Sequence, residues 1–271
     1  MIANPVESPQ MKSFISFNIN TRLLRLTAFS LPFLIALFFL LFKQISDYYY
    51  PITHVNFYLG TVREDRIVEW MTAIFYLLSS ILSVSIAFRF RRHNEILDFT
   101  LYALLGFGLF VIFGEEISWG QRIFHNTSPE FFLRNSTQQE INMHNLRPIQ
   151  RITRYAYIGI GLYGSILWIA KSHMSKFAIS KYLQYTVPGW YLASYFFQVA
   201  FFYFYYYYIS PINNFLHLSY HDAEVSELIL SMGFLLFLAI KYFEQLQEYR
   251  MNVSNVIRVL QKQFPVKEIP E

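Results

Sequence analysis

Five glutamates fall at the ends of long apolar segments, where carboxylates in a membrane protein can meet in a partly dry site. They are Glu69, Glu115, Glu116, Glu224 and Glu227. Carboxylates in apolar segments are costly, so they tend to face a bundle interior or a water-filled cavity. In the adjacent pair Glu115 and Glu116, desolvation and mutual repulsion favour keeping a proton on one carboxylate near neutral pH. We therefore predict that these two residues are catalytic, as a general acid or base.

Histidines and further carboxylates in two loops suggest a site for a divalent metal. His217, His221 and Glu224 follow at spacings of four and three, and they share a face if the segment is one helix. Glu140 and His144 are four apart and would share a face of another helix. Imidazole and carboxylate donors suit zinc, iron or manganese, although one such histidine can equally be a hydrogen-bonded interfacial residue. The predicted metal ligands are His144, Glu140, His217, His221, Glu224 and Glu227.

Other polar residues around the same segments are candidates for holding a substrate. The Arg122 guanidinium suits a phosphate or carboxylate head group. Trp119 could line an acyl path, or it could be an ordinary lipid-facing or core aromatic residue. The segment 128–130, Ser-Pro-Glu, predicts a short helix capped by Ser128. The predicted substrate-binding residues are Glu69, Trp119, Gln121, Arg122, Asn142 and Asn145.

Two of these segments together resemble a known motif set. The run GEEISWGQRIF over 114–124, followed by QEINMHN over 139–145, is similar to a family of bacterial integral membrane proteins with no assigned activity. The resemblance covers about 114–145 and extends to the acidic start of the last apolar segment. It implies that the glutamates, tryptophan, glutamine, asparagines and histidine of the motif matter, and it implies no particular reaction.

A fainter likeness is to the multi-span metal hydrolases that include the alkaline ceramidases and the progestin/adiponectin receptors. The run EDRIVEWMTAIFYLLS over 64–79 resembles the acid-rich start of the first ceramidase span. That superfamily has seven spans and a zinc held by histidines. Here we count six spans, and Ser118 and His125 are seven apart where the superfamily has a spacing of four. The likeness therefore serves as an analogy for a membrane hydrolase.

The composition identifies the elements that must position these residues as membrane helices. Of 271 residues, 54% are hydrophobic and only 15% are charged, against about 25% charged in a typical soluble domain. The net charge of +4 comes from basic residues at the ends of apolar runs, which indicates membrane topology and argues against nucleic acid as a partner. The expected partners are the lipid bilayer and a lipid or amphiphilic substrate.

We predict an all-α, polytopic transmembrane helix bundle of about six spans, each of roughly 20 mostly apolar residues. The loop between spans three and four is too apolar for a solvated loop, so we expect interfacial or re-entrant helices in it. A short amino-terminal segment (1–22) and an amphipathic tail (243–271) flank the membrane domain (23–242). The predicted spans are 23–42, 67–88, 99–119, 155–170, 186–210 and 223–242.

The order of the spans brings the acidic ends together. Spans two and six begin, and span three ends, on the same side of the bilayer, so all five glutamates reach one level. Most lysines and arginines lie on the other side, which predicts cytoplasmic termini, outward-facing glutamates and a bacterial inner membrane location. Dipole stabilisation alone could explain Glu69, Glu224 and Glu227 at helix starts, but it opposes Glu115 and Glu116 at a helix end.

Three function classes fit this arrangement. The first is a metal-dependent enzyme, such as a hydrolase or lipid-modifying enzyme, acting on a lipid or amphiphilic substrate at the outer face. The second is a proton- or cation-coupled transporter that uses the same glutamates, although transport sites usually lie near the midplane of inverted repeats. The third is a structural or accessory membrane subunit whose acids order the long loop.

Overall fold

The computed structural model describes residues 21–63, 66–137, 139–173 and 185–263, and within these ranges the protein is helical with no β-strand. This confirms the predicted all-α fold class. Short helices form in the loop after the third predicted span, as expected. The elements are α1 (Thr21–Thr53), α2 (Leu59–Val62), α3 (Ile67–Arg92), α4 (Ile96–Glu116), η1 (Ser118–Gly120), α5 (Gln121–Phe124), α6 (Glu130–Asn135), α7 (Arg147–His173), η2 (Trp190–Leu192), α9 (Ala193–Phe204), η3 (Tyr205–Ile209), η4 (Tyr220–Asp222) and α10 (Ala223–Gln263).

Four helical segments of the described chain are long and apolar enough to cross a membrane, which supports a multi-pass membrane protein. They coincide with the predicted spans one, two, three and six, and they are Arg22–Thr53, Leu59–Arg92, Ile96–Glu116 and Tyr220–Asn255. The predicted spans four and five fall on α7 and on α9 with η3. Helix α7 begins with three arginines, and α9 gives way after 12 residues to the π-helix η3, so both have a weaker membrane signature.

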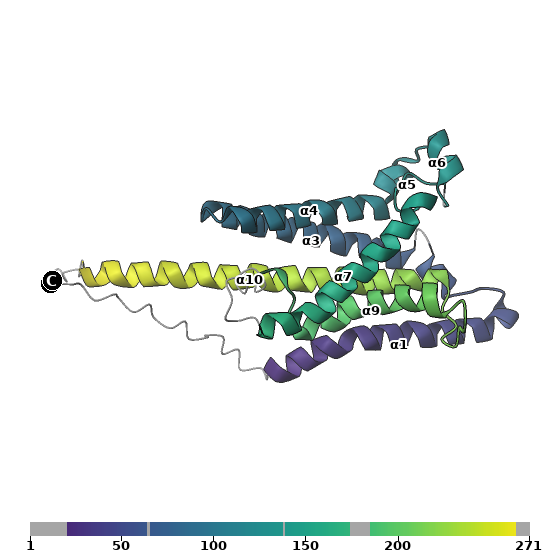
Figure 1. Ribbon diagram of the computed structural model, residues 1–271, viewed down its shortest axis with the longest axis horizontal. Helices are drawn as coiled ribbons and strands as arrows, with labels where there is room; N and C mark the ends of the chain where they lie inside the picture. Colours follow the sequence, from purple (N-terminus) through teal and green to yellow (C-terminus); the bar gives the residue numbers. More distant parts are fainter. Residues whose placement is uncertain (1–20, 64–65, 138, 174–184, 264–271) are drawn as a thin grey trace, which may run out of the picture.

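The helices pack as a bundle with one splayed pair (Figure 1). Helices α3 and α4 form an antiparallel hairpin, α10 packs on α3 and α9, and α7 crosses α9 obliquely. Small residues bring α3 and α4 close together: the Ser80 Oγ donates to the Gly106 carbonyl at 2.7 Å, and the Ser83 Oγ donates to the Tyr102 carbonyl at 2.7 Å. Close backbone approach through small residues is typical of membrane helix pairs.

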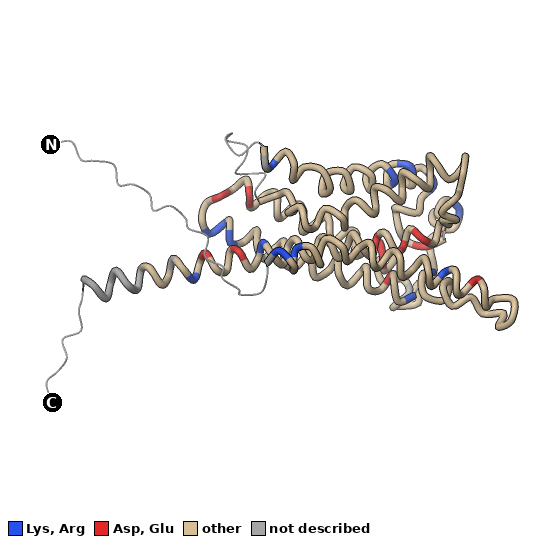
Figure 2. Tube along the Cα trace, turned by 90° about the horizontal axis from the view of Figure 1, so that it is seen from below, with Lys and Arg blue, Asp and Glu red and all other residues tan. Residues whose placement is uncertain are grey.

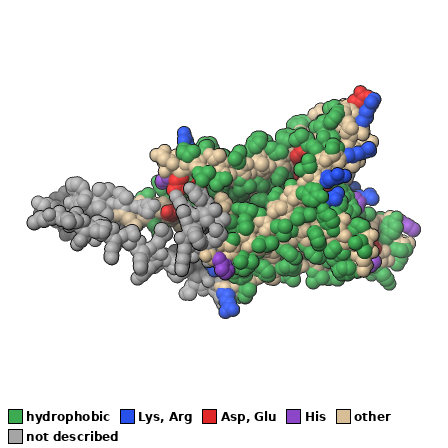
Figure 3. All heavy atoms as spheres, in the orientation of Figure 1, with side chains coloured by type: hydrophobic (Ala, Val, Ile, Leu, Met, Phe, Trp, Pro, Cys, Tyr) green, Lys and Arg blue, Asp and Glu red, His purple; other side chains and the backbone are tan. Residues whose placement is uncertain are grey.

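The outer surface of the bundle suits a lipid environment. Hydrophobic side chains cover most of the face in Figure 3, and many leucines and phenylalanines of α1 and α4 are exposed, such as Leu24, Phe38 and Phe107. Charged residues gather toward the two ends of the bundle and leave a largely uncharged middle (Figure 2). This distribution is the one expected when lipid, and not a protein core, surrounds apolar helices.

The ends of two helices position the acidic residues. Helix α4 ends at Glu116 and α10 begins at Ala223, and both points lie at the same end of the bundle (Figure 1). We call this end the carboxylate end. At the other end α10 continues without a break to Gln263, so the described part of the predicted tail belongs to the same helix as the sixth predicted span. Residues 1–20 and 264–271 lie outside the described structure.

Candidate metal centre

Three glutamates converge at the carboxylate end. Glu116 is the last residue of α4, whereas Glu224 and Glu227 lie in the first turns of α10. One carboxylate oxygen from each residue lies within 4.8 Å of those of the other two. A spacing of three puts Glu224 and Glu227 on one helix face, and the amino-terminal dipole of α10 favours their charge. We call these three residues the glutamate trio.

Three tyrosines from three other helices surround the trio. The Tyr203 hydroxyl of α9 donates to the Glu227 carboxylate at 2.5 Å. Tyr157 of α7 stacks on Tyr203 with ring centroids 4.7 Å apart and interacts electrostatically with Glu227 and Glu116. Tyr76 of α3 is completely buried and lies close enough to Glu116 and Glu227 to interact with both. Its hydroxyl has no hydrogen-bond partner among the described residues, although buried polar groups are normally satisfied.

This arrangement suits a divalent cation held by oxygen atoms. Three carboxylates this close repel one another, and a cation relieves the repulsion. Three oxygen atoms spaced evenly around one calcium ion at about 2.6 Å can lie up to about 4.5 Å from one another, and magnesium bonds of about 2.1 Å reduce this separation to about 3.6 Å. The 4.8 Å limit of the trio is slightly larger than the calcium value, so a small closure fits calcium and a larger closure fits magnesium or manganese. Carboxylate-only donor sets are typical of these three metals.

Glu115 points away from the trio and anchors the long loop. Its Oε1 accepts a hydrogen bond from the Trp119 indole at 2.7 Å. Its Oε2 accepts bonds from the backbone N–H groups of Met143 at 2.5 Å and His144 at 3.0 Å. The His144 Nδ1 lies 3.4 Å from the same oxygen. The two adjacent glutamates that we predicted to act as a pair thus face different surroundings.

A tight backbone turn explains why the motif contains two glycines and a tryptophan. Ser118, Trp119 and Gly120 all have positive φ values, 46°, 53° and 79°, which glycine adopts freely and other residues adopt at a cost. The turn folds the Trp119 ring back onto α4. A Cβ at position 114 would lie 2.9 Å from the ring, so Gly114 leaves the space that the ring needs.

Side chains of this turn hold the loop that follows. The Ser118 Oγ donates to the Glu140 carboxylate at 2.7 Å. The Gln121 side chain accepts from the Ile141 N–H at 2.7 Å and donates to the Ser128 Oγ at 2.7 Å. The two halves of the motif, 114–124 and 139–145, are therefore one packed unit. Ser128 donates in turn to the Gln139 carbonyl at 2.5 Å, so it does not cap α6 as predicted.

The remaining predicted site residues divide into two groups. Glu69 lines a small hollow together with Glu116 and is thus beside the trio. Asn142 and Asn145 are buried in the loop, where the Asn142 amide donates to the Ser118 Oγ at 3.4 Å. The Arg122 side chain lies outside the described part of the structure, so its predicted role stays a prediction.

The segments 139–145 and 213–219 do not form the expected helices, so the predicted metal ligands do not come together in one site. Residues 139–145 form a loop that begins with Gln139 at a positive φ of 58°, so Glu140 and His144 do not share a helix face. His217 has a φ of 50° and lies in a loop, before η4 and α10. The expectation that His217, His221 and Glu224 share one face was therefore wrong. Of the six predicted ligands, only Glu224 and Glu227 belong to the trio.

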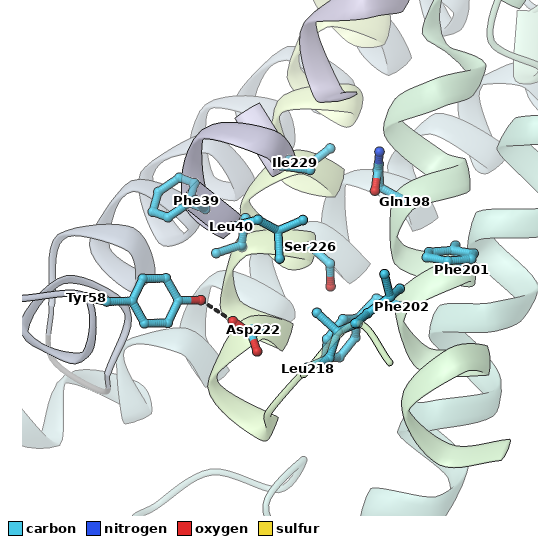
Figure 4. A pocket seen from close by; sticks show the side chains of 13 residues that line it. Phe39, Leu40, Tyr58, Gln198, Phe201, Phe202, Leu218, Asp222, Ser226 and Ile229 are labelled. Atoms are coloured by element: carbon cyan, nitrogen blue, oxygen red, sulfur yellow. Dashed lines mark hydrogen bonds between the residues drawn. The ribbon is translucent and has the colours of Figure 1, made fainter. Parts of the chain in front are cut away.

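A second acidic site at the same end did not emerge from the sequence. Asp222 accepts a hydrogen bond from the Lys43 ammonium at 2.6 Å and another from the Tyr58 hydroxyl (Figure 4). It also forms a capping box with Ser219 at the start of α10. The serine and aspartate three residues apart are a capping signal that could have identified this site. Burial and the neighbouring Asp222 raise the pKa of the Tyr58 hydroxyl above its usual range, so the hydroxyl stays a donor.

Beside Asp222 lies a small cavity of about 90 Å³. Gln198, the only amide deep in the fifth predicted span, lines it together with Ser226 (Figure 4). Most of its lining is apolar, and the polar side chains in it belong to Tyr58, Gln198, Asp222 and Ser226. The larger spaces in the bundle lie elsewhere.

Comparisons of this chain with protein-family models, with curated proteins and with solved structures give no match. The resemblance of the motif to a bacterial membrane family therefore stays a prediction. What the protein does must be inferred from the geometry of its own residues.

Proposed function

We propose that this protein is a membrane enzyme that binds a divalent cation at the glutamate trio and acts on an amphiphilic substrate. One observation carries the proposal: carboxylate oxygens of Glu116, Glu224 and Glu227 converge within 4.8 Å beside a buried tyrosine hydroxyl that has no hydrogen-bond partner among the residues that the structure describes. Acidic side chains often gather on protein surfaces without a ligand. A fully buried hydroxyl at the same place, without a partner in the described part of the chain, is the second sign that supports a ligand at this site.

The donor set favours calcium, magnesium or manganese over zinc or iron. All three donors are carboxylates, whereas zinc and iron sites usually include histidine or cysteine. Of the histidines that we predicted as ligands, His217 lies in a loop and donates nothing to the trio, and its carbonyl instead accepts from Lys43 at 2.9 Å. His144 lies against Glu115 and is close enough to Glu227 to interact with it electrostatically, but it is not among the residues whose ligand atoms converge at the trio. Manganese is the one metal that is favoured both by the sequence prediction and by the all-carboxylate donor set.

The residues around the trio have distinct parts in the proposed chemistry. A divalent cation bound there supplies Lewis-acid polarisation of a substrate oxygen. Tyr203 holds the Glu227 carboxylate in place through its hydrogen bond. The Tyr76 hydroxyl, which has no partner within the described ranges of the chain, can orient or stabilise a substrate oxygen. The loop anchored by Glu115 is tied to the last turn of α4, next to Glu116.

The position of the trio supports an enzyme more than a carrier. Its members lie in the last turn of one apolar helix and the first turns of another, so the site is at the end of the bundle, where a lipid head group meets the polar loops. Carriers tend to bind their ions near the midplane of the membrane, between inverted repeats. Substrates that are part polar and part apolar fit a site in this position.

The test is cation binding and turnover by the full-length chain purified in detergent. Equilibrium dialysis against Mn²⁺ should give one bound ion per chain, and Glu116→Gln and Glu227→Gln should each lower the affinity at least 100-fold. Glu140→Gln and His217→Ala are matched controls that should bind as the wild type does. With mixed phospholipid and glycolipid vesicles, mass spectrometry should detect products that form only with the cation.

Two results would overturn the proposal. If the glutamine variants bind Mn²⁺ as the wild type does, the trio is not the metal site. If the wild type binds the ion but catalyses only glutamate-dependent cation or proton flux across vesicles, the protein is a carrier.

A further inference from the structure

A large apolar cavity lies between α4 and α7, in the part of the bundle that faces lipid. Its volume is about 530 Å³, within the range of about 300–1,000 Å³ that is usual for small-molecule sites. Leu105, Leu109 and Ile112 of α4 form one wall, and Phe234 and Phe237 of α10 form its floor. The oblique course of α7 separates it from α4 over this stretch (Figure 1).

Glycines show that the cavity is a built feature of the two helices. A Cβ at Gly106 would meet Val84 at 2.8 Å, and Cβ atoms at Gly161 and Gly164 would meet Ala200 and Phe196 even more closely. These glycines allow helices to touch. Gly108 and Gly159 line the cavity, and a Cβ at either position would meet no atom within 4 Å. Gly108 and Gly159 therefore border open space, whereas Gly106, Gly161 and Gly164 lie at close contacts between helices.

Two tyrosine hydroxyls lie at the end of the cavity away from the glutamate trio. The Tyr163 hydroxyl donates to the Thr186 carbonyl at 3.2 Å, and the Tyr102 hydroxyl donates to the Tyr185 carbonyl at 2.5 Å. These hydroxyls thus already have partners. The side of the cavity opens to lipid past Leu104, which is 63% exposed. An occupant of this space needs to be apolar, and it can enter from the bilayer.

The other end of the cavity leads to the glutamate trio. Ile112 lines the cavity and lies one helical turn before Glu116 on the same face of α4. Phe234 lines it as well, and its ring is 6.4 Å from the ring of Tyr76, which lies beside the trio. From Leu101 to Ile112 the cavity extends roughly 16 Å along α4, at about 1.5 Å per residue, which is about half of the hydrocarbon core of roughly 30 Å.

We infer that this cavity binds the acyl chain of the substrate, with the polar head at the glutamate trio and the methyl end toward Tyr102 and Thr186. The inference rests on the proposed function, and it specifies the substrate as a long-chain lipid that enters sideways from the bilayer. With a head group oxygen at the trio and the acyl chain in the cavity, the bond that joins the head group to the chain would lie where the cavity meets the trio.

The test uses two photoactivatable palmitoyl phospholipids in vesicles that contain the full-length protein. One probe has its diazirine near the carbonyl and the other near the chain end, and mass spectrometry identifies the labelled residues. The first probe should label near Ile112 and the second near Leu101 and Tyr163. Gly108→Leu and Gly159→Leu fill the cavity without a clash and should lower this labelling at least fivefold. Phe107→Trp and Leu162→Trp add bulk on exposed positions and should leave it unchanged.

The outcomes separate this inference from the proposed function. Equal labelling in the leucine variants, or labels in reverse order along α4, would overturn the acyl-chain site even if Mn²⁺ binds normally. If cavity labelling is ordered and sensitive to Gly108→Leu but Mn²⁺ does not bind, the chain site holds and the metal centre fails. With both sites intact, the leucine variants should bind Mn²⁺ with wild-type affinity and yield at least fivefold less product.

Discussion

Two carboxylate sites lie at the start of α10, and they differ in what surrounds the negative charge. One is Asp222, and the other is the glutamate trio. Asp222 is 7% exposed and is held by Lys43, Tyr58 and its own capping box. Glu224 and Glu227 follow within two turns and turn toward Glu116, so three acids face one another. At Asp222 a lysine supplies the compensating charge in a fixed geometry. At the trio, one carboxylate oxygen of each glutamate lies within 4.8 Å of those of the other two, which is the basis for the proposed metal site.

The difference shows how one helix end can serve both structure and chemistry. The Asp222 site ties α1, the segment before α2 and α10 together, which fixes where α10 begins. That in turn fixes the positions of Glu224 and Glu227 relative to Glu116. A buried ion pair adds little net stability over an apolar packing, but removing one partner is costly because the other charge stays buried. We therefore assign Asp222 an architectural part and the trio a chemical one.

The largest loss of stability should come from removing the Lys43 ammonium group beside Asp222. Lys43→Met leaves Asp222 buried without its ammonium partner, so the free energy of unfolding in detergent should fall by about 3–5 kcal/mol. The double variant Lys43→Met with Asp222→Asn keeps the acceptor oxygen for Tyr58 and should recover most of the loss. A Lys43→Met protein as stable as the wild type would show that this pair does not organise the bundle end.

A smaller effect, local to the loop 139–145, should follow when Glu115 binds this loop less tightly. Glu115→Gln removes the charge that accepts hydrogen bonds from Met143 and His144, and bonds to charged groups contribute about 1.5–3 kcal/mol each. Amide hydrogen exchange at 139–145 should speed up at least tenfold, with Mn²⁺ affinity retained. Unchanged exchange together with lost turnover would instead favour the catalytic role that the sequence predicts for Glu115.

The smallest effect should come from a residue that only positions a ligand. Tyr203→Phe removes the hydrogen bond to Glu227, and loss of such supporting bonds typically lowers metal affinity by about 10-fold or more. Isothermal titration with Mn²⁺ measures the change. Tyr195→Phe on the same helix is the control, because the Tyr195 hydroxyl has no hydrogen-bond partner among the described residues. Equal affinities of the two variants would contradict the positioning role of Tyr203.

The convergence of the trio could be predicted because it follows from the direction of each span. Apolar length and charge locate the helix ends, and alternating spans bring the end of α4 to the start of α10. The ligand set could not be predicted, since it depends on short-range backbone choices. His217 and Gln139 adopt positive φ values, and the Lys43 bond to the His217 carbonyl comes from 174 residues away in the sequence.

The tyrosines around the trio were also beyond the reach of sequence patterns. Tyr76 and Tyr203 lie inside apolar segments that contain many aromatic residues. Which face of a membrane helix meets a site depends on helix packing, because apolar residues cover both the lipid side and the buried side. The acyl-chain cavity arises in the same way, from the angle between α4 and α7.

The most direct test of the central claim is to locate the cation itself. Crystals of the full-length protein soaked in Mn²⁺ should show an anomalous scattering peak at bonding distance from the carboxylates of Glu116, Glu224 and Glu227, and Glu227→Gln should abolish it. A peak bound by His217 and His221, or wild-type crystals in saturating Mn²⁺ without a peak at the trio, would contradict the account.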